Sequence, residues 1–132
     1  MSVESPHHDH DGLRRLRSSE IALLKELLSK CSSLHLIDGG LDDILVRDMN
    51  DGGMGSILFS GDENRIIGGS IVDADYFDSD GVLVNISVNV DNSGKIYEVD
   101  FWKVDFSPLL VYPCPDSIKI HPTPVQCSTI SG

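Results

Sequence analysis

The sequence predicts an α+β domain in which an N-terminal helix packs on a mainly antiparallel sheet of about five strands. Two patterns carry this prediction. Apolar side chains recur at helical spacing between residues 19 and 30, whereas residues 82–90 alternate between Val or Ile and other side chains without a break. Gly, Asp and Asn are dense between the later apolar segments, which favours tight turns and consecutive strands after a single helix.

The predicted helix is capped by Ser18 or Ser19 and runs to about Lys30. Serine side chains accept hydrogen bonds from the first free backbone N–H groups of a helix, and Glu20 places a negative charge where the helix dipole favours it. The face expected to contact the sheet comprises Ile21, Leu24, Leu27, Leu28 and Cys31. Residues 1–12 precede the helix as a leader that we expect to be disordered.

The first strands are expected at residues 44–49, 56–60 and 65–77. The third of them contains Gly68 and Gly69, where a β-bulge costs little, so we expect it to bend there. Four prolines lie between residues 113 and 124, and we expect residues 114–132 to form an extended tail with one edge strand between Ile118 and His121. A single domain is therefore expected over residues 13–113.

Residues 82–105 read as the central hairpin of the sheet, in a meandering strand order. A four-residue loop at 91–94 suits tight-turn dihedrals and pairs Val88 with Tyr97, so that apolar side chains oppose one another on one face. The predicted reverse face carries polar and aromatic side chains, namely Asn85, Glu98, Asp100 and Trp102. A slip by one residue would bury two carboxylates, and this cost fixes which face points inward.

Composition favours one small globular domain in the cytoplasm. The chain has 132 residues and is 40% hydrophobic, which is enough to bury a core without disulfides. Its three cysteines show no C-x-x-C spacing, which favours free thiols in a reducing compartment. The N-terminal segment has no apolar run, and no stretch approaches the ~20 apolar residues of a membrane helix, so we expect no membrane association.

The charge is strongly negative and unevenly distributed. Acidic and basic side chains cancel over residues 1–30, so the net charge of −11 belongs to the strand-forming part. Nucleic acid would be repelled by this surface, whereas a basic protein or a cation would be attracted. An acidic surface that only keeps the protein soluble is the simpler alternative.

The predicted reverse face and the acidic turn beside it form our candidate partner-binding surface. It comprises Glu98, Asp100, Trp102, Asn85, Asp73, Asp75, Asp78 and Asp80. Carboxylates would attract a basic partner protein, and an aromatic side chain would anchor it. No Ser-His-Asp or Cys-His pattern is present, so we assign no catalytic residue, metal ligand or cofactor.

The same residues leave a second hypothesis open, in which a small enzyme or a ligand-binding or divalent-cation-binding domain uses the polar sheet face. Glu98 and Asp100 lie two strand positions apart, about 7 Å, which is a separation that glycosidase carboxylates use. A calcium-loop pattern places acidic and polar residues at matching positions from Asn89 to Asp100, but without flanking helices. Residues 50–56 are rich in glycine but lack the lysine of a phosphate loop.

Two short motifs carry a resemblance to a known family. The turn D-G-G-M-G-S at residues 51–56 and the segment D-F-W-K-V-D-F-S-P at residues 100–108 resemble the signatures of a small bacterial domain family of unknown function. The resemblance implies an α+β fold and a bacterial cytosolic origin, and it implies no catalytic residues. Similar small acidic domains occur among immunity proteins of bacterial toxin systems, so we expect a non-enzymatic inhibitor or immunity protein. The pattern carries no signal for an oligomeric state.

Overall fold

The computed structural model describes residues 12–30 and 40–122 of the chain. These residues form one α-helix, two short 3₁₀ helices and seven strands. The elements are β1 (Leu13–Arg15), α2 (Ser18–Leu27), η1 (Leu28–Lys30), β2 (Leu45–Asp48), β3 (Ile57–Phe59), β4 (Ile67–Phe77), β5 (Leu83–Asp91), β6 (Ile96–Lys103), η2 (Pro115–Ser117) and β7 (Lys119–Pro122). None of the helices in this part of the chain is long and apolar enough to span a membrane.

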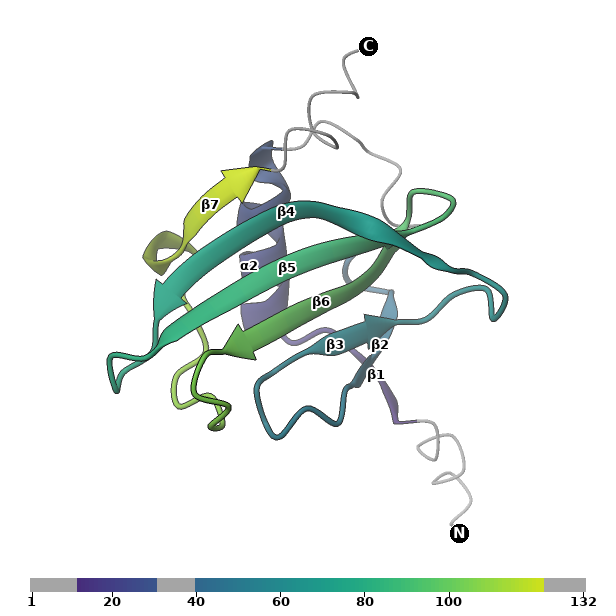
Figure 1. Cartoon of the computed structure of the whole chain (residues 1–132). Coiled ribbons are helices and arrows are strands. Elements are labelled where there is room, and N and C mark those ends of the chain that lie inside the picture. The colour runs from purple at the N-terminus through teal and green to yellow at the C-terminus, as the bar shows by residue number, and fades with distance from the viewer. Residues whose placement is uncertain (1–11, 31–39, 123–132) are drawn as a thin grey trace, which may run out of the picture.

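All seven strands belong to one sheet with the order β1-β2-β3-β6-β5-β4-β7, and every neighbouring pair is antiparallel (Figure 1). The α+β class is confirmed, but the sheet has seven strands where five were predicted. The order also departs from a simple meander, because β3 pairs with β6 and β7 returns to the far edge of β4. The edge strand predicted near Ile118 is confirmed as β7.

The predicted register of the central hairpin is wrong by two residues. Val88 pairs with Val99, and Tyr97 is an extra residue between the pairs formed by Ile96 and Glu98. This bulge and a tighter turn closed by Asp91 and Lys95 account for the shift. An even shift keeps the side-chain alternation, so the valines of β5 are buried and the polar face remains outside.

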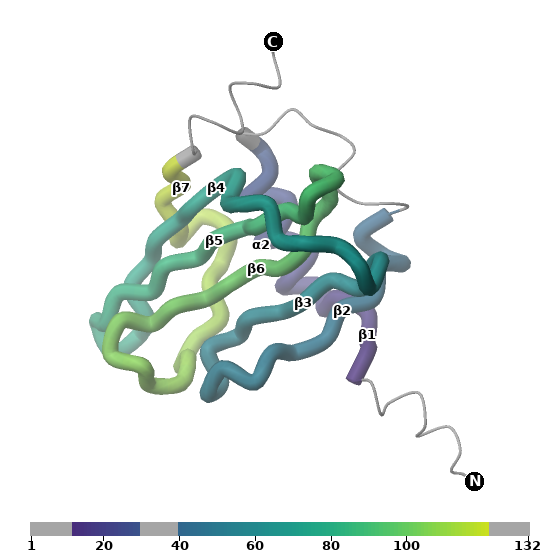
Figure 2. The backbone as a smooth tube through the Cα atoms, turned by 45° about the vertical axis from the view of Figure 1, so that its right-hand side comes forward, coloured from purple at the N-terminus to yellow at the C-terminus, as the bar shows by residue number. Residues whose placement is uncertain are grey.

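The helix and one face of the sheet share a single hydrophobic core. Figures 1 and 2 show α2 behind the sheet, with its axis crossing the strands. The buried side chains of the helix are Leu23, Leu24 and Leu27, and they belong to the same cluster as Val72, Val84, Ile86, Val88, Val99 and Phe101 of the sheet. Sequence analysis identified the helix but missed Leu23 on its buried face.

The helix begins one or two residues earlier than predicted, with Arg17 at the N-cap position in place of Ser18 or Ser19. The reason lies in Glu20, whose buried carboxylate accepts the Arg17 backbone N–H at 2.7 Å. Arg14 of β1 donates to both oxygens of the same carboxylate at 2.8 Å. Charge-assisted bidentate bonds of this kind outweigh a serine cap, and they join β1 to the start of α2.

The bend predicted in β4 is confirmed by register shifts on both sides of Gly69. A Cβ at Gly68 would lie 2.9 Å from the Asp91 carbonyl oxygen, so the adjacent strand approaches too closely for a side chain. Of the three cysteines, only Cys114 lies in the described part, where it is free and exposed. The predicted leader before Gly12, Cys31, Cys127 and the last ten residues lie outside the described residues.

Candidate functional site

The outer face of the sheet, opposite α2, carries rows of side chains that run across the strands. Strand pairing places Glu98 beside Asn89, Asp100 beside Ser87 and Trp102 beside Asn85. On the other side of β5, Asp73 lies beside Ser87 and Asp75 beside Asn85. These side chains alternate along each strand with fully buried apolar neighbours, so they point away from the core. Six of the eight predicted surface residues are thereby brought together, namely Glu98, Asp100, Trp102, Asn85, Asp73 and Asp75.

Neutral neighbours hold three of these outer-face carboxylates in place. Asn89 donates to Glu98 at 2.7 Å, Ser87 to Asp73 at 2.6 Å, and Asn85 to Asp75 at 3.0 Å. The side-chain amide and hydroxyl groups of Asn89, Ser87 and Asn85 are therefore engaged within the sheet.

The negative charge of the outer face has little compensation. No Lys or Arg of the described residues forms an ion pair with Glu98, Asp100, Asp73 or Asp75. The His121 ring lies 3.0 Å from Asp75, and Lys119 of β7 is the cross-strand neighbour of Asp75. In the described part of the chain, no group of three or more His, Cys, Asp or Glu side chains is placed to hold a metal ion. The face thus presents fixed negative charge.

One end of the outer face is aromatic and exposed. Trp102 is 48% exposed, Phe106 is 64% exposed, and their rings meet edge to face with centroids 4.8 Å apart. A turn after β6, closed by the Phe106 N–H and the Lys103 carbonyl, brings Phe106 back beside the indole. Phe106 is the one non-glycine residue of the described chain with a positive φ, at 66°. Phe77 on β4 extends the apolar surface on the same face.

The structure removes Asp78 and Asp80 from the predicted surface. Asp78 is fully buried, and its carboxylate lies 2.8 Å from the Nζ of Lys103, which is buried as well. Asp80, one third exposed, binds the same ammonium at 2.8 Å, and the Pro108 carbonyl accepts from it at 3.2 Å. These two aspartates therefore neutralise a lysine inside the domain and do not face a partner.

Asp78 remains ionised in this buried position because donors surround it. Burial alone would raise the pKa of its carboxyl, but Lys103 and the backbone N–H groups of Leu110, Ser79 and Val111 outweigh burial and lower that pKa to about 2. For Lys103, burial lowers the pKa of the ammonium, and the two aspartates more than compensate, so the pKa is raised. The cluster of Asp78, Asp80 and Lys103 therefore holds the segment after β6 against the sheet through hydrogen bonds to Pro108, Leu110 and Val111.

The two sequence motifs meet at the same end of the sheet. Beyond the short β3, the backbone N–H groups of β6 find side-chain acceptors, because Phe101 donates to Ser56 Oγ at 2.8 Å and Lys103 donates to Met54 Sδ at 3.4 Å. Leu109 donates to the Gly53 carbonyl at 3.0 Å, and a Cβ at Gly53 would lie 3.3 Å from Pro108. The D-G-G-M-G-S turn thus replaces a missing strand partner on both sides of Trp102, at Phe101 and Lys103.

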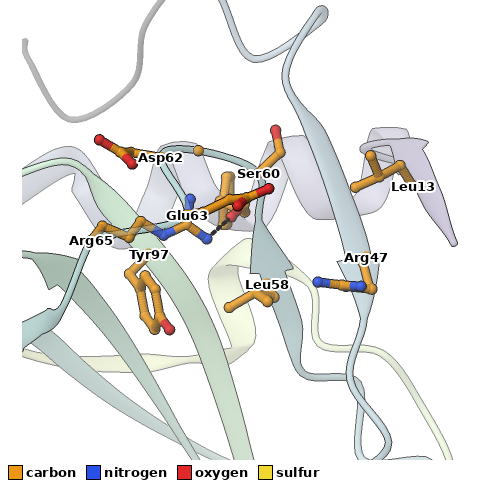
Figure 3. Close-up of a pocket in the computed structure, with 10 residues that line it drawn as sticks. Leu13, Arg47, Leu58, Ser60, Asp62, Glu63, Arg65 and Tyr97 are labelled. Carbon is orange, nitrogen blue, oxygen red and sulfur yellow. Dashed lines mark hydrogen bonds between the residues drawn. The ribbon is translucent and has the colours of Figure 1, made fainter. Parts of the chain in front are cut away.

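A pocket of about 430 Å³ lies beside the outer face, near the ends of β1, β2 and β3 (Figure 3). Its walls include Leu13, Arg47, Leu58, Arg65 and Tyr97, together with the loop after β3. The Arg65 guanidinium lies 4.6 Å from the centroid of the Tyr97 ring. Sequence analysis missed this site because Tyr97 was assigned to the buried face of β6, and only the bulge turns it toward the pocket.

The fold and the outer face together define a small α+β domain with one acidic, partly aromatic sheet surface. Residues 13–113 match the family described as "Domain of unknown function (DUF6984)", and the chain belongs to this family. The predicted resemblance to a domain family of unknown function is thereby confirmed. The matched segment contains β1 to β6 and both motifs, and it ends before η2 and β7. No curated protein and no solved structure matches the chain.

Proposed function

We propose that this domain is a non-enzymatic binding protein of the inhibitor or immunity class, whose outer face covers a basic partner protein in the bacterial cytoplasm. The observation that supports the proposal most is the exposed aromatic pair of Trp102 and Phe106 on a face whose Glu98, Asp100 and Asp73 form no ion pair with the described residues. Desolvated aromatic side chains are the residues that most often dominate binding energy, and surrounding charges choose the partner. The mechanism is occlusion of the surface on which the face docks.

The aromatic pair lowers the stability of the fold, and this supports a role for it in binding. An exposed Phe contributes little to the core, and a left-handed backbone conformation costs a non-glycine residue about 1–2 kcal/mol. Strain of this kind persists where the surrounding structure enforces it, and it concentrates at functional sites. Here the turn at Lys103 and the ring of Trp102 hold Phe106 in place.

The partner should be a basic protein because of the charge of the outer face. Fixed carboxylates attract positive side chains over a distance of about a Debye length, and they repel phosphate backbones. The net charge of −11 adds a long-range attraction that speeds encounter. Once docked, Lys or Arg side chains of the partner would pair with Glu98, Asp73 and Asp75, while an apolar pocket of the partner accepts the aromatic pair.

Capture and kinetics together test the proposal. The immobilised full chain is used to capture proteins from a bacterial lysate, and the captured protein is purified and its association rate is measured at increasing NaCl. We expect a basic protein whose association rate falls by about tenfold or more as salt rises. The double charge reversal of Glu98→Lys and Asp73→Lys should slow association, whereas Trp102→Ala should mainly accelerate dissociation.

The matched control for charge is Asp116→Lys, because Asp116 is an exposed carboxylate on η2, away from the outer face. Asp116→Lys raises the net charge by two, as the single reversal Glu98→Lys does, so these two variants are compared directly. Asp116→Lys should associate almost normally, whereas Glu98→Lys should slow association. If Asp116→Lys slowed association equally, the slowing would reflect the general charge of the protein, and the outer face would not be a specific binding surface. Tight binding that ignores both salt and the reversals would also refute the proposal.

A further inference from the structure

Arg65 is unusual in this acidic chain because its guanidinium forms no close ion pair with a carboxylate of the described residues, although the buried Asp91 carboxylate interacts with it electrostatically. Acidic side chains outnumber Lys and Arg by 21 to 10, yet no Asp or Glu of the described residues forms an ion pair with Arg65. The side-chain hydrogen bond of Arg65 there goes to the neutral Phe59 carbonyl. The side chain is half-buried, so its guanidinium is not fully hydrated, and its N–H groups contact no carboxylate oxygen of the described residues. Such a charge suits an external anion.

The local structure holds the guanidinium ready for a ligand. The ring of Tyr97 lies beneath it, and the Phe59 carbonyl accepts from one terminal nitrogen, which leaves N–H donors of the fork unused. A Cβ at Gly61 would overlap the same guanidinium, so the glycine leaves the space that the side chain occupies. A fixed planar fork loses little conformational entropy when it binds carboxylate or phosphate oxygens.

The cavity around Arg65 has room for a small molecule. Its volume of about 430 Å³ falls within the range of ligand pockets, and Leu13 and Leu58 supply apolar walls. Figure 3 shows Arg47 extending toward Leu58 from the opposite side of the pocket, which adds a second positive charge. Asp62 and Glu63 also line the pocket and oppose an anion, so they limit the affinity.

We propose that this pocket binds a small ligand through an oxyanion, either a carboxylate or a phosphate, which the guanidinium of Arg65 holds by its unused N–H groups. The site is independent of the outer-face aromatic pair and of the partner proposed above. Each of the two functions can therefore fail without the other.

Titration of the full chain by nuclear magnetic resonance tests the proposal, with inorganic phosphate and acetate as separate probes at constant ionic strength. The Arg65 Nε–Hε signal and the amides of residues 58–65 and 97 should shift and saturate with at least one probe. Saturation by one probe alone identifies the oxyanion chemistry of the natural ligand. Arg65→Gln should weaken the binding by about tenfold or more, because a charge-assisted hydrogen bond pair is lost.

Three further variants separate a specific site from general attraction. Gly61→Ala keeps the charge but displaces the guanidinium, and should weaken binding severalfold while the fold is retained. Glu63→Gln should strengthen binding, because it removes one of the two opposing charges from the pocket. Lys25→Gln removes an exposed positive charge from α2 and should leave the affinity within about twofold. Absence of saturable shifts with both probes, or equal losses in Arg65→Gln and Lys25→Gln, would overturn the proposal.

Discussion

Phe106 combines two features that cost stability, an exposed ring and a left-handed backbone. Glycine adopts positive φ without the steric penalty, although it loses more entropy on folding. Phe106→Gly is therefore expected to leave the free energy of unfolding unchanged or to raise it by up to about 1 kcal/mol. The same variant should weaken binding to the captured basic partner by about tenfold or more, because the aromatic pair is lost.

Urea denaturation and binding kinetics on the same Phe106→Gly preparation measure both quantities. A fall in stability with binding intact would mean that the ring packs for structural reasons. Leu110→Gly is a suitable comparison, since Leu110 is also exposed but lies outside the aromatic pair.

Asp78 is the buried half of an ion pair, so its loss should be costly. Asp78→Ala leaves the buried Lys103 ammonium with one carboxylate, that of the one-third-exposed Asp80, and it removes the acceptor of the Leu110 and Val111 N–H groups. We expect the free energy of unfolding to fall by about 3 kcal/mol, as for other buried pairs broken on one side. Asp116→Ala, at an exposed position, should change it by less than about 0.5 kcal/mol. Similar values for the two variants in urea denaturation would contradict this account of the cluster.

Part of the cluster formed by Asp78, Asp80 and Lys103 can be predicted from the sequence. Lys103 follows Val99 and Phe101 at even spacing, so strand alternation alone places it on the buried face, where an ammonium requires a carboxylate partner. The partner is harder to predict. Asp78 lies in a turn, where no periodicity assigns a direction, and it was therefore grouped with the exposed acidic residues of β4. The fold decides its environment through the segment after β6, which covers it.

Strand β6 depends on the D-G-G-M-G-S turn for hydrogen bonds that a neighbouring strand would normally supply. Ser56 is buried, accepts the Phe101 N–H at 2.8 Å and donates to Asp100 at 3.2 Å. Ser56→Ala leaves the Phe101 N–H without its acceptor and should lower the free energy of unfolding by about 1–3 kcal/mol. Faster hydrogen exchange at the Phe101 amide would locate the defect.

The comparison variant for this hydrogen bond is Ser60→Ala, because Ser60 is exposed in the loop after β3. It should have nearly wild-type stability. If both serine variants unfold at the same urea concentration as the wild type, the turn does not support β6 in the way described.

Strand alternation predicts the faces of β5 and β6, but it does not determine their register. Pairing Val88 with Tyr97 or with Val99 places an apolar side chain opposite an apolar one in either case, so the sequence offers no penalty against the wrong choice. The bulge at Tyr97 decides between them, and it also creates the pocket. β1 was missed for a simpler reason, because three residues are too few to show a period.

The charged groups across the whole domain respond to acid in the same direction. The hydrogen bond from Arg14 lowers the pKa of Asp48. Burial would raise the pKa of Glu20, but the hydrogen bonds that its carboxylate accepts from Arg14 and Arg17 outweigh burial and lower that pKa too. The pKa of Asp91 is likewise lowered, because its hydrogen bonds to Ser93 and Lys95 outweigh the effect of burial. With Asp78 at about 2, four carboxyl groups in three regions of the fold hold protons less readily than in the unfolded chain.

Stability should therefore be constant near neutral pH and should fall in acid. A carboxyl whose folded pKa is depressed stabilises the fold above its unfolded pKa of about 4, and this contribution is lost as the pH falls toward the folded value. We expect the urea midpoint to change little between about pH 7 and 5 and to fall steeply between about pH 4 and 2. Arg14→Gln should lower stability at neutral pH and reduce the difference between neutral and acidic pH, because Glu20 and Asp48 lose their shared partner. A transition centred above about pH 6 would instead indicate histidine titration, and would show that these carboxylates do not control the stability of the domain.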